Sequence, residues 1–141
     1  MRFMVMVPAN KDSEAGTLPS GPELAQMGKF NEELVKAGVM LAGEGLQASS
    51  KGAKIKFAGG KTAVVDGPFT EAKEMIAGFW IIQTKSKEEA IAWMKRAPFP
   101  DGTTLEIRQI FESADFAPSD PTGELRAKED ALRAQVSSRK S

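Results

Sequence analysis

The chain has 141 residues, enough for one domain with a hydrophobic core, and its 19 Lys and Arg residues balance its 19 Asp and Glu residues. Because neither charge is in excess, we expect no nucleic-acid partner. The absence of Cys, His and Tyr excludes disulfides, thiolate metal sites and Ser-His triads, and it leaves Asp, Glu, Lys, Arg, Ser and Thr for any chemistry.

The first half of the chain begins with an apolar run, RFMVMV at residues 2–7, which predicts a strand that ends at Pro8. This run is too short for a signal peptide or a bilayer span, so we expect a cytoplasmic protein without a membrane partner. A polar loop rich in Gly and Pro follows. Ser20 and Pro22 then predict the start of a helix, and apolar residues recur at helical spacing until Gly38 ends it.

The middle of the chain predicts three more strands. Residues 39–47 form a strand in which glycines flank Glu44, and residues 54–66 form a hairpin that turns at Gly59-Gly60. A short irregular connection, GPFTEAKE, follows the hairpin. Residues 75–84, MIAGFWIIQT, are nearly all apolar, which is typical of a central strand covered on both faces.

The last third of the chain predicts a helix, a strand and a final helix. Ser86 and Glu89 form a capping-box pattern at the start of the first of these helices. Residues 103–111 alternate as a strand does. The final helix, from about Thr122 to Val136, has few large apolar residues, so we expect it to pack weakly on the domain or on a partner subunit and to fray at its end.

These elements together predict an α+β fold of the ferredoxin-like type, with a mainly antiparallel sheet and two helices on one face. We assign residues 1–115 to this domain and residues 116–141 to an extension that contains the C-terminal helix. The second face of the sheet would expose apolar side chains, and a second copy of the sheet is the simplest cover for it. The sequence therefore predicts a homodimer.

Three segments carry a resemblance to a known family: EELVKAGVMLAGEGLQ, VVDGPFTEAKEMIAGFWII and LEIRQI. In order and spacing they resemble the DGPF-domain proteins, a branch of the YciI-related family, over roughly residues 2–112. The resemblance implies a dimeric α/β-barrel in which two ferredoxin-like subunits pack sheet to sheet and enclose a cavity.

The same resemblance implies little about activity. Most DGPF-domain proteins are uncharacterised, and some are encoded beside extracytoplasmic-function sigma factors, which suggests a regulatory role. Some YciI relatives are discussed as enzymes with a His-Asp pair. This chain has no His, so only the Asp half of that pair has a candidate here, Asp66.

Two carboxylates are candidate catalytic residues. Asp66 precedes Gly67-Pro68 at the end of the hairpin, where an Asp commonly accepts backbone N–H groups in a turn; the alternative is a general base or ligand anchor at the mouth of the cavity. Glu44 shares a face, by parity, with the apolar residues of its strand. It is either a carboxylate inside the cavity or a surface residue at a bulge.

Four further residues are candidates for ligand binding. Arg108 would hold a carboxylate or phosphate by its guanidinium fork, or else form a salt bridge with Glu106 on the same face. Lys73 is either solvated or paired with Asp66 or Glu44. Phe79 and Trp80 either belong to the core or line the cavity. We expect no metal and no cofactor, because no spaced set of Asp and Glu residues and no phosphate-binding loop is present.

Three functions agree with these residues. The first is a small-molecule-binding or regulatory protein whose ligand lies in the dimer cavity. The second is a cofactor-free isomerase, lyase or cyclase in which Asp66 or Glu44 moves a proton. The third is a non-catalytic interaction module associated with sigma-factor regulation.

Overall fold

The computed structural model describes residues 1–71 and 74–139 of the chain. The backbone divides into two compact units, Met1–Gln109 and Ile110–Ser141, and each is described on its own. Of the helices formed by the described residues, none is long and apolar enough to cross a membrane.

The first unit is built around a four-stranded antiparallel sheet. Its strands are β1 (Arg2–Pro8), β2 (Met40–Gly45), β5 (Ile76–Gln83) and β6 (Glu106–Gln109). They lie in the order β2-β5-β1-β6, and every neighbouring pair is antiparallel. The apolar strand β5 therefore lies inside the sheet, as its composition predicts.

Helix α2 (Gly21–Lys36) follows β1 and begins where the sequence predicts it. The hydroxyl of the N-cap residue Ser20 accepts the N–H of Glu23 at 3.3 Å. The loop before it, however, contains a short helix that the sequence did not indicate, α1 (Lys11–Glu14). There the Asn10 side chain caps the helix by accepting the N–H of Ser13 at 2.9 Å.

Helix α3 (Lys87–Met94) connects β5 to β6. Its N-cap is Ser86, whose hydroxyl accepts the N–H of Glu89 at 3.1 Å, as predicted. The reciprocal half of the predicted capping box differs, because the Glu89 carboxylate accepts the N–H of Lys85 instead. With the hairpin β3 (Ala53–Ala58) and β4 (Lys61–Asp66) between β2 and β5, the chain order β1-α2-β2-β3-β4-β5-α3-β6 agrees with the predicted order and the ferredoxin-like fold.

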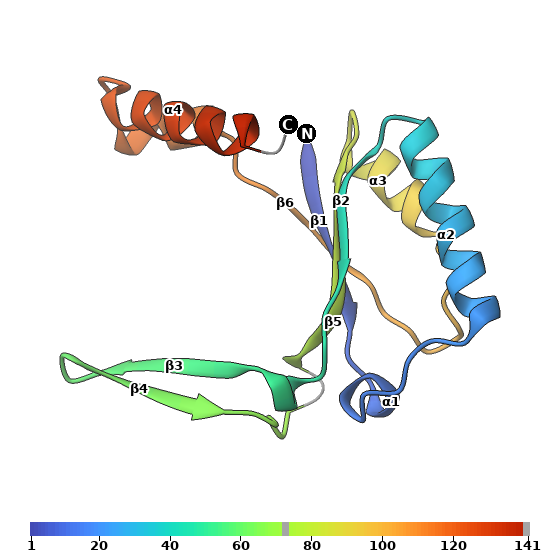
Figure 1. The fold of residues 1–141 in the computed structure, drawn as a ribbon. Coiled ribbons are helices and arrows are strands. Elements are labelled where there is room, and N and C mark those ends of the chain that lie inside the picture. The colour runs from blue at the N-terminus through green and yellow to red at the C-terminus, as the bar shows by residue number, and fades with distance from the viewer. Residues whose placement is uncertain (72–73, 140–141) are drawn as a thin grey trace. The chain divides into compact units, whose positions relative to one another are not determined.

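Helices α2 and α3 both cover one face of the four-stranded sheet (Figure 1). The side chains between the two layers form the hydrophobic core, which is the dominant favourable contribution to folding. Five of them are less than 2 % exposed, and Leu34 of α2 is among these five. The core residues are Phe3, Val5, Phe30, Leu34, Val39, Trp80, Ile82, Ala90 and Met94.

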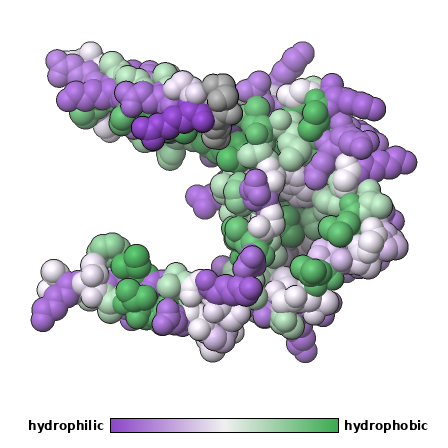
Figure 2. Space-filling view, viewed as in Figure 1, coloured by the Kyte–Doolittle hydropathy of each residue, from purple (hydrophilic) through white to green (hydrophobic). Residues whose placement is uncertain are grey.

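Strands β3 (Ala53–Ala58) and β4 (Lys61–Asp66) form the predicted hairpin as a sheet of their own, not paired with the four-stranded sheet. Gly59 and Gly60 make the turn with φ of 59° and 74°, which glycine adopts without strain. All residues of both strands are exposed. Ile55, Phe57 and Val64 share one face of the hairpin, and Figure 2 shows hydrophobic side chains gathered along it.

The second unit consists of a 3-10 helix, η3 (Ser113–Ser119), followed by α4 (Glu124–Ser138). Helix α4 confirms the predicted C-terminal helix, which starts and ends two residues later than expected. None of its residues is buried. This agrees with the thin apolar stripe of its sequence, in which Leu125, Leu132 and Val136 are the large apolar residues.

Candidate functional site

The face of the four-stranded sheet opposite the helices, which we call the open face, carries most of the predicted site residues. Two rows of side chains cross it from β2 to β6, because directly paired residues of antiparallel strands point to the same side. The first row is Glu44, Phe79, Met6 and Glu106; the second is Ala42, Ile81, Met4 and Arg108. In these two rows the middle positions are therefore apolar, and the charges lie on the outer strands.

Glu44 lies on the open face, directly opposite Phe79. Strand alternation predicts that Glu44 shares a face with Met40, Ala42 and Leu46, and this is wrong for Met40. A register shift between Met40 and Ala42 leaves Met40 opposite Ile82 on the helix side, while Ala42 stays on the open face. Glu44 is exposed, and no described residue donates a hydrogen bond to its carboxylate.

Arg108 and Glu106 share the open face of β6, in agreement with the strand alternation. The Arg108 Nε and a Glu106 carboxylate oxygen are 4.0 Å apart, and the side chains are 74 % and 64 % exposed. An ion pair of this length and exposure contributes little to stability. The guanidinium of Arg108 therefore keeps most of its donors available for another anion.

Phe79 and Trp80 point to opposite sides of the sheet, because they are consecutive residues of one strand. Phe79 is half-buried on the open face. Trp80 is 4 % exposed in the core, where its indole N–H donates to the side-chain oxygen of Asn31 at 3.0 Å. The rings of Phe30 and Phe99 meet it edge to face, at 5.9 and 6.0 Å. Its place is in the helix-side core and not in a cavity over the open face.

Asp66 is the last residue of β4 and is exposed, paired in register with Ala53. No backbone N–H within residues 1–71 and 74–139 donates to its carboxylate, so the turn-forming hydrogen bonds considered for it are not present there. Lys73, its potential cationic partner, lies outside the described residues.

The segment after Asp66 is held by a set of hydrogen bonds with another loop. The N–H of Gly67 donates to the carbonyl of Gly52 at 3.0 Å, and the N–H of Phe69 donates to the Ser49 hydroxyl at 3.0 Å. The Glu14 carboxylate in turn accepts both the N–H and the hydroxyl of Ser49. These contacts give the DGPF segment a structural role, and no motif in the sequence predicts the contact between Ser49 and Glu14.

Two pockets lie elsewhere, and neither is lined by Asp66, Glu44 or Arg108. One, of about 1140 Å³, lies beside the end of β1 and the start of α2, with Phe99 in its wall. The other, of about 340 Å³, belongs to the second unit. Within the described part of the chain, no three Asp or Glu residues are grouped so that they could hold a metal ion.

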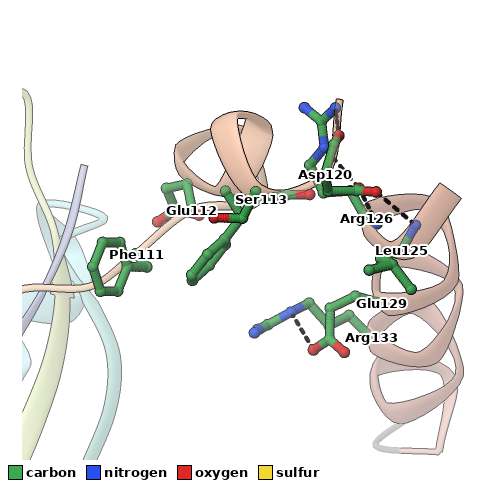
Figure 3. A pocket seen from close by; sticks show the side chains of 10 residues that line it. Phe111, Glu112, Ser113, Asp120, Leu125, Arg126, Glu129 and Arg133 are labelled. Carbon is green, nitrogen blue, oxygen red and sulfur yellow. Dashed lines mark hydrogen bonds and ion pairs between the residues drawn. The ribbon is translucent and has the colours of Figure 1, made fainter. Parts of the chain in front are cut away.

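The pocket of the second unit is organised by Asp120, which the sequence did not single out (Figure 3). Asp120 is only 7 % exposed. Its carboxylate accepts the N–H of Leu125 at 3.3 Å and the N–H of Arg126 at 3.0 Å, so it caps α4, where the N-cap position itself is Gly123. The Arg126 guanidinium adds a contact of 3.2 Å to the same carboxylate.

These contacts make the stability of the second unit depend on pH. The backbone N–H of Arg126 is the main cause that lowers the pKa of Asp120 below the usual 3.8. Burial, the second largest effect, raises this pKa, and the Leu125 N–H and the Arg126 guanidinium add to the lowering. A lowered pKa means that the stabilisation is complete above pH 3.8 and is lost as the pH falls through the pKa of the folded state.

We therefore expect the amide resonances of Leu125 and Arg126 to shift as wild-type protein is acidified below pH 3.8. In Asp120→Asn the same resonances should show no titration there, because the carboxylate is gone. Two-dimensional NMR spectra recorded across this range make the comparison. Equal titration in both proteins would contradict the assigned capping role.

The fold and the open face place the chain in a class of small α+β proteins with an antiparallel sheet uncovered on one side. The chain belongs to the YCII-related domain family, which matches residues 1–114. This confirms the resemblance drawn from the sequence.

The proteins similar to the chain include one curated relative and one solved structure. The uncharacterized protein R00369 of Rhizobium meliloti (strain 1021) is 31 % identical over 68 residues, which are 48 % of this chain and 55 % of that protein. The chain thus matches about half the length of this curated relative. A solved structure of 5-chloro-2-hydroxyhydroquinone dehydrochlorinase (TftG) from Burkholderia phenoliruptrix AC1100, in complex with 2,5-dihydroxybenzoquinone, is 18 % identical with a TM-score of 0.38. The match covers 81 % of this chain and 98 % of that one.

Proposed function

We propose that the protein binds a small molecule over the open face of its sheet, in a cavity that a second copy of the chain closes. The observation that carries this proposal is the pair of rows across the open face. Phe79, Ile81 and two methionines form an apolar floor, and Glu44, Glu106 and Arg108 stand on the outer strands. An apolar floor with a few polar groups is the usual composition of a ligand site.

The second copy is part of the proposal because the unit leaves two apolar surfaces uncovered. One is the open face and the other is the hairpin, where Phe57 is 79 % and Val64 is 68 % exposed. A two-stranded hairpin is marginally stable alone, and exposed apolar patches mark interaction sites. Two copies packed sheet to sheet as a dimeric α/β-barrel would cover such surfaces in an isologous contact.

We further propose that residues 1–115 form the ligand-binding domain and residues 116–141 an extension of it. Arg108 is the residue that would select the ligand, since its exposed guanidinium on the open face favours a carboxylate or phosphate. The ligand class that fits both features is an aromatic or aliphatic acid, with its apolar part on Phe79 and its anion at Arg108. Asp66 would stand at the edge of this cavity.

A cofactor-free acid–base enzyme is the second candidate. What favours it is that no described residue donates a hydrogen bond to the carboxylate of Glu44 or Asp66, so both retain lone pairs that can accept a proton from a ligand. Turnover of a bound acid that is lost in Glu44→Gln or in Asp66→Asn, with binding retained, would distinguish this enzyme from a binding protein.

Thermal unfolding with a matched set of probes tests the site. We expect benzoate to raise the melting temperature of the wild type, while benzyl alcohol and benzylammonium raise it less, because only benzoate pairs with Arg108. A ligand at 100 times its Kd adds about 2.7 kcal/mol to the free energy of unfolding. Loss of one charge-assisted hydrogen bond, about 1.5–3 kcal/mol, should weaken benzoate roughly tenfold or more in Arg108→Ala.

The matched control is Arg96→Ala, which removes an exposed arginine that follows α3 and is paired with Glu33. This variant should bind benzoate as the wild type does. If benzoate stabilises Arg108→Ala as strongly as the wild type, the open-face site is wrong.

A further inference from the structure

The pocket of the second unit lies mostly outside the part of the chain that matches the family. Its volume is about 340 Å³, near the lower end of the range for small-molecule sites. Seven of its ten lining residues follow residue 114, where the family match ends. They come from η3, α4 and the turn between them. The pocket is thus a feature of the extension and separate from the proposed open-face site.

The walls of this pocket are aromatic and aliphatic. The rings of Phe111 and Phe116 are 5.0 Å apart between centroids, inclined at 45°. Phe111 is 68 %, Phe116 47 % and Leu125 63 % exposed. Three large apolar side chains around one hollow leave a surface that gains free energy when an apolar group replaces water.

Four charged residues of the pocket form two ion pairs, Asp120 with Arg126 and Glu129 with Arg133. Arg126 donates from Nε to the Asp120 carboxylate at 3.2 Å and from Nη2 to the Asp120 carbonyl at 2.9 Å. Arg133 lies 3.2 Å from the Glu129 carboxylate, one helical turn earlier on α4. Figure 3 shows both pairs on the α4 side, across from the segment that carries Phe111. No arginine of the pocket is left for an anionic ligand without breaking an existing pair.

From these contacts we infer that the pocket binds an uncharged aromatic molecule of one or two rings. The faces and edges of Phe111 and Phe116 would contact the ring of the ligand, as aromatic pairs do at offset or edge-to-face geometry. The hydroxyls of Ser113 and Ser119, which also line the pocket, can exchange hydrogen bonds with a phenolic or carbonyl group. An acid or an amine would have to compete with the two ion pairs.

The frame of the pocket does not depend on the ligand. Asp120 fixes the start of α4 through two backbone N–H groups, and Arg126 ties the helix back to the Asp120 carbonyl. A preformed site loses less ordering entropy on binding than a flexible one. One side of the pocket is formed by Leu125, Glu129 and Arg133. They lie on the same face of α4 because they are four residues apart.

Saturation-transfer difference NMR on the full-length protein tests the inference with three probes that share one ring system. These are 2-naphthol, 2-naphthoate and 2-naphthylmethylammonium, which are neutral, anionic and cationic. We expect 2-naphthol to give the strongest signal in the wild type. In Phe116→Ala its affinity should fall roughly tenfold, the upper end of what one aromatic contact contributes.

Two further variants separate loss of the pocket from loss of the fold. Ser113→Phe fills the hollow with a ring and should abolish 2-naphthol binding while the circular dichroism of α4 is retained. Phe57→Ala removes an equally large and more exposed ring from the hairpin and should leave binding unchanged. The inference is overturned if 2-naphthol binds Ser113→Phe as it binds the wild type, or if 2-naphthoate binds more tightly than 2-naphthol. Since the open-face site is tested with Arg108→Ala, either proposal can fail without the other.

Discussion

Replacing Ile81 with lysine is expected to convert the proposed homodimer to a monomer. Ile81 lies on the inner strand β5, opposite Ala42 on one side and Met4 on the other, in the middle of the open face. A second sheet packed on this face would bury the ammonium group of the new lysine. The row of side chains that contains position 81 has no carboxylate to pair with it. Burial of an unpaired charge costs several kcal/mol, so the dimer should dissociate about a thousandfold more readily.

Light scattering coupled to size-exclusion chromatography at micromolar concentration measures this effect directly. In the isolated subunit Ile81 is partly exposed, so its lysine replacement can extend to water and the fold should survive. The emission of Trp80, which lies in the core on the other side of the sheet, reports that survival. Ala92→Lys adds the same charge at an exposed position of α3 and should remain dimeric. A wild type that is monomeric at this concentration would refute the dimeric barrel.

Replacing Gly67 with alanine is expected to disrupt the connection between the hairpin and the loop at Ser49. A Cβ at this position would lie against the carbonyl oxygen and carbon of Ser49 at less than any separation found in proteins. Both groups are backbone, so neither can move without breaking the bonds from Gly67 to Gly52 and from Phe69 to Ser49. We expect a loss of about 3 kcal/mol in local stability, as for severe overpacking.

Native-state hydrogen exchange of the Gly67 and Phe69 amides measures that loss, because it reports local as well as global opening. The matched control is Gly28→Ala in α2, where an added Cβ meets no heavy atom within 4 Å other than those of adjacent residues and the helix backbone. There alanine should stabilise the helix by about 0.4–1 kcal/mol. Unchanged exchange at Phe69 in Gly67→Ala would show that the packing against Ser49 is not rigid.

Features with a local physical cause could be predicted from the sequence. Ser20 and Ser86 begin helices because each hydroxyl can accept an N–H three residues later. Gly59 and Gly60 make a turn because both adopt positive φ. The apolar strand β5 lies between β2 and β1, the interior position that its apolar composition predicts. The open face followed from the same alternation of residues.

Features that depend on pairing between distant segments could not be predicted. Glu44 shares its face with Ala42 but not with Met40, because the register shift between Met40 and Ala42 turns these two residues to opposite faces of the sheet. Phe79 and Trp80 were expected together in the core or in the cavity lining, but consecutive residues of a strand point to opposite faces of the sheet. The carboxylates of Glu14 and Asp120 were missed because their backbone partners are defined only by the folded chain.

The sequence alone therefore determined the order of the main strands and helices, the N-caps of α2 and α3 and the ferredoxin-like arrangement, since these depend on neighbouring residues and on apolar periodicity. The tertiary structure decided which side chains meet: the rows across the open face, the structural role of the DGPF segment and the pocket of the extension. These depend on strand register and on hydrogen bonds between residues far apart in the chain, such as Ser49 and Glu14. Local propensity carries no information about such contacts.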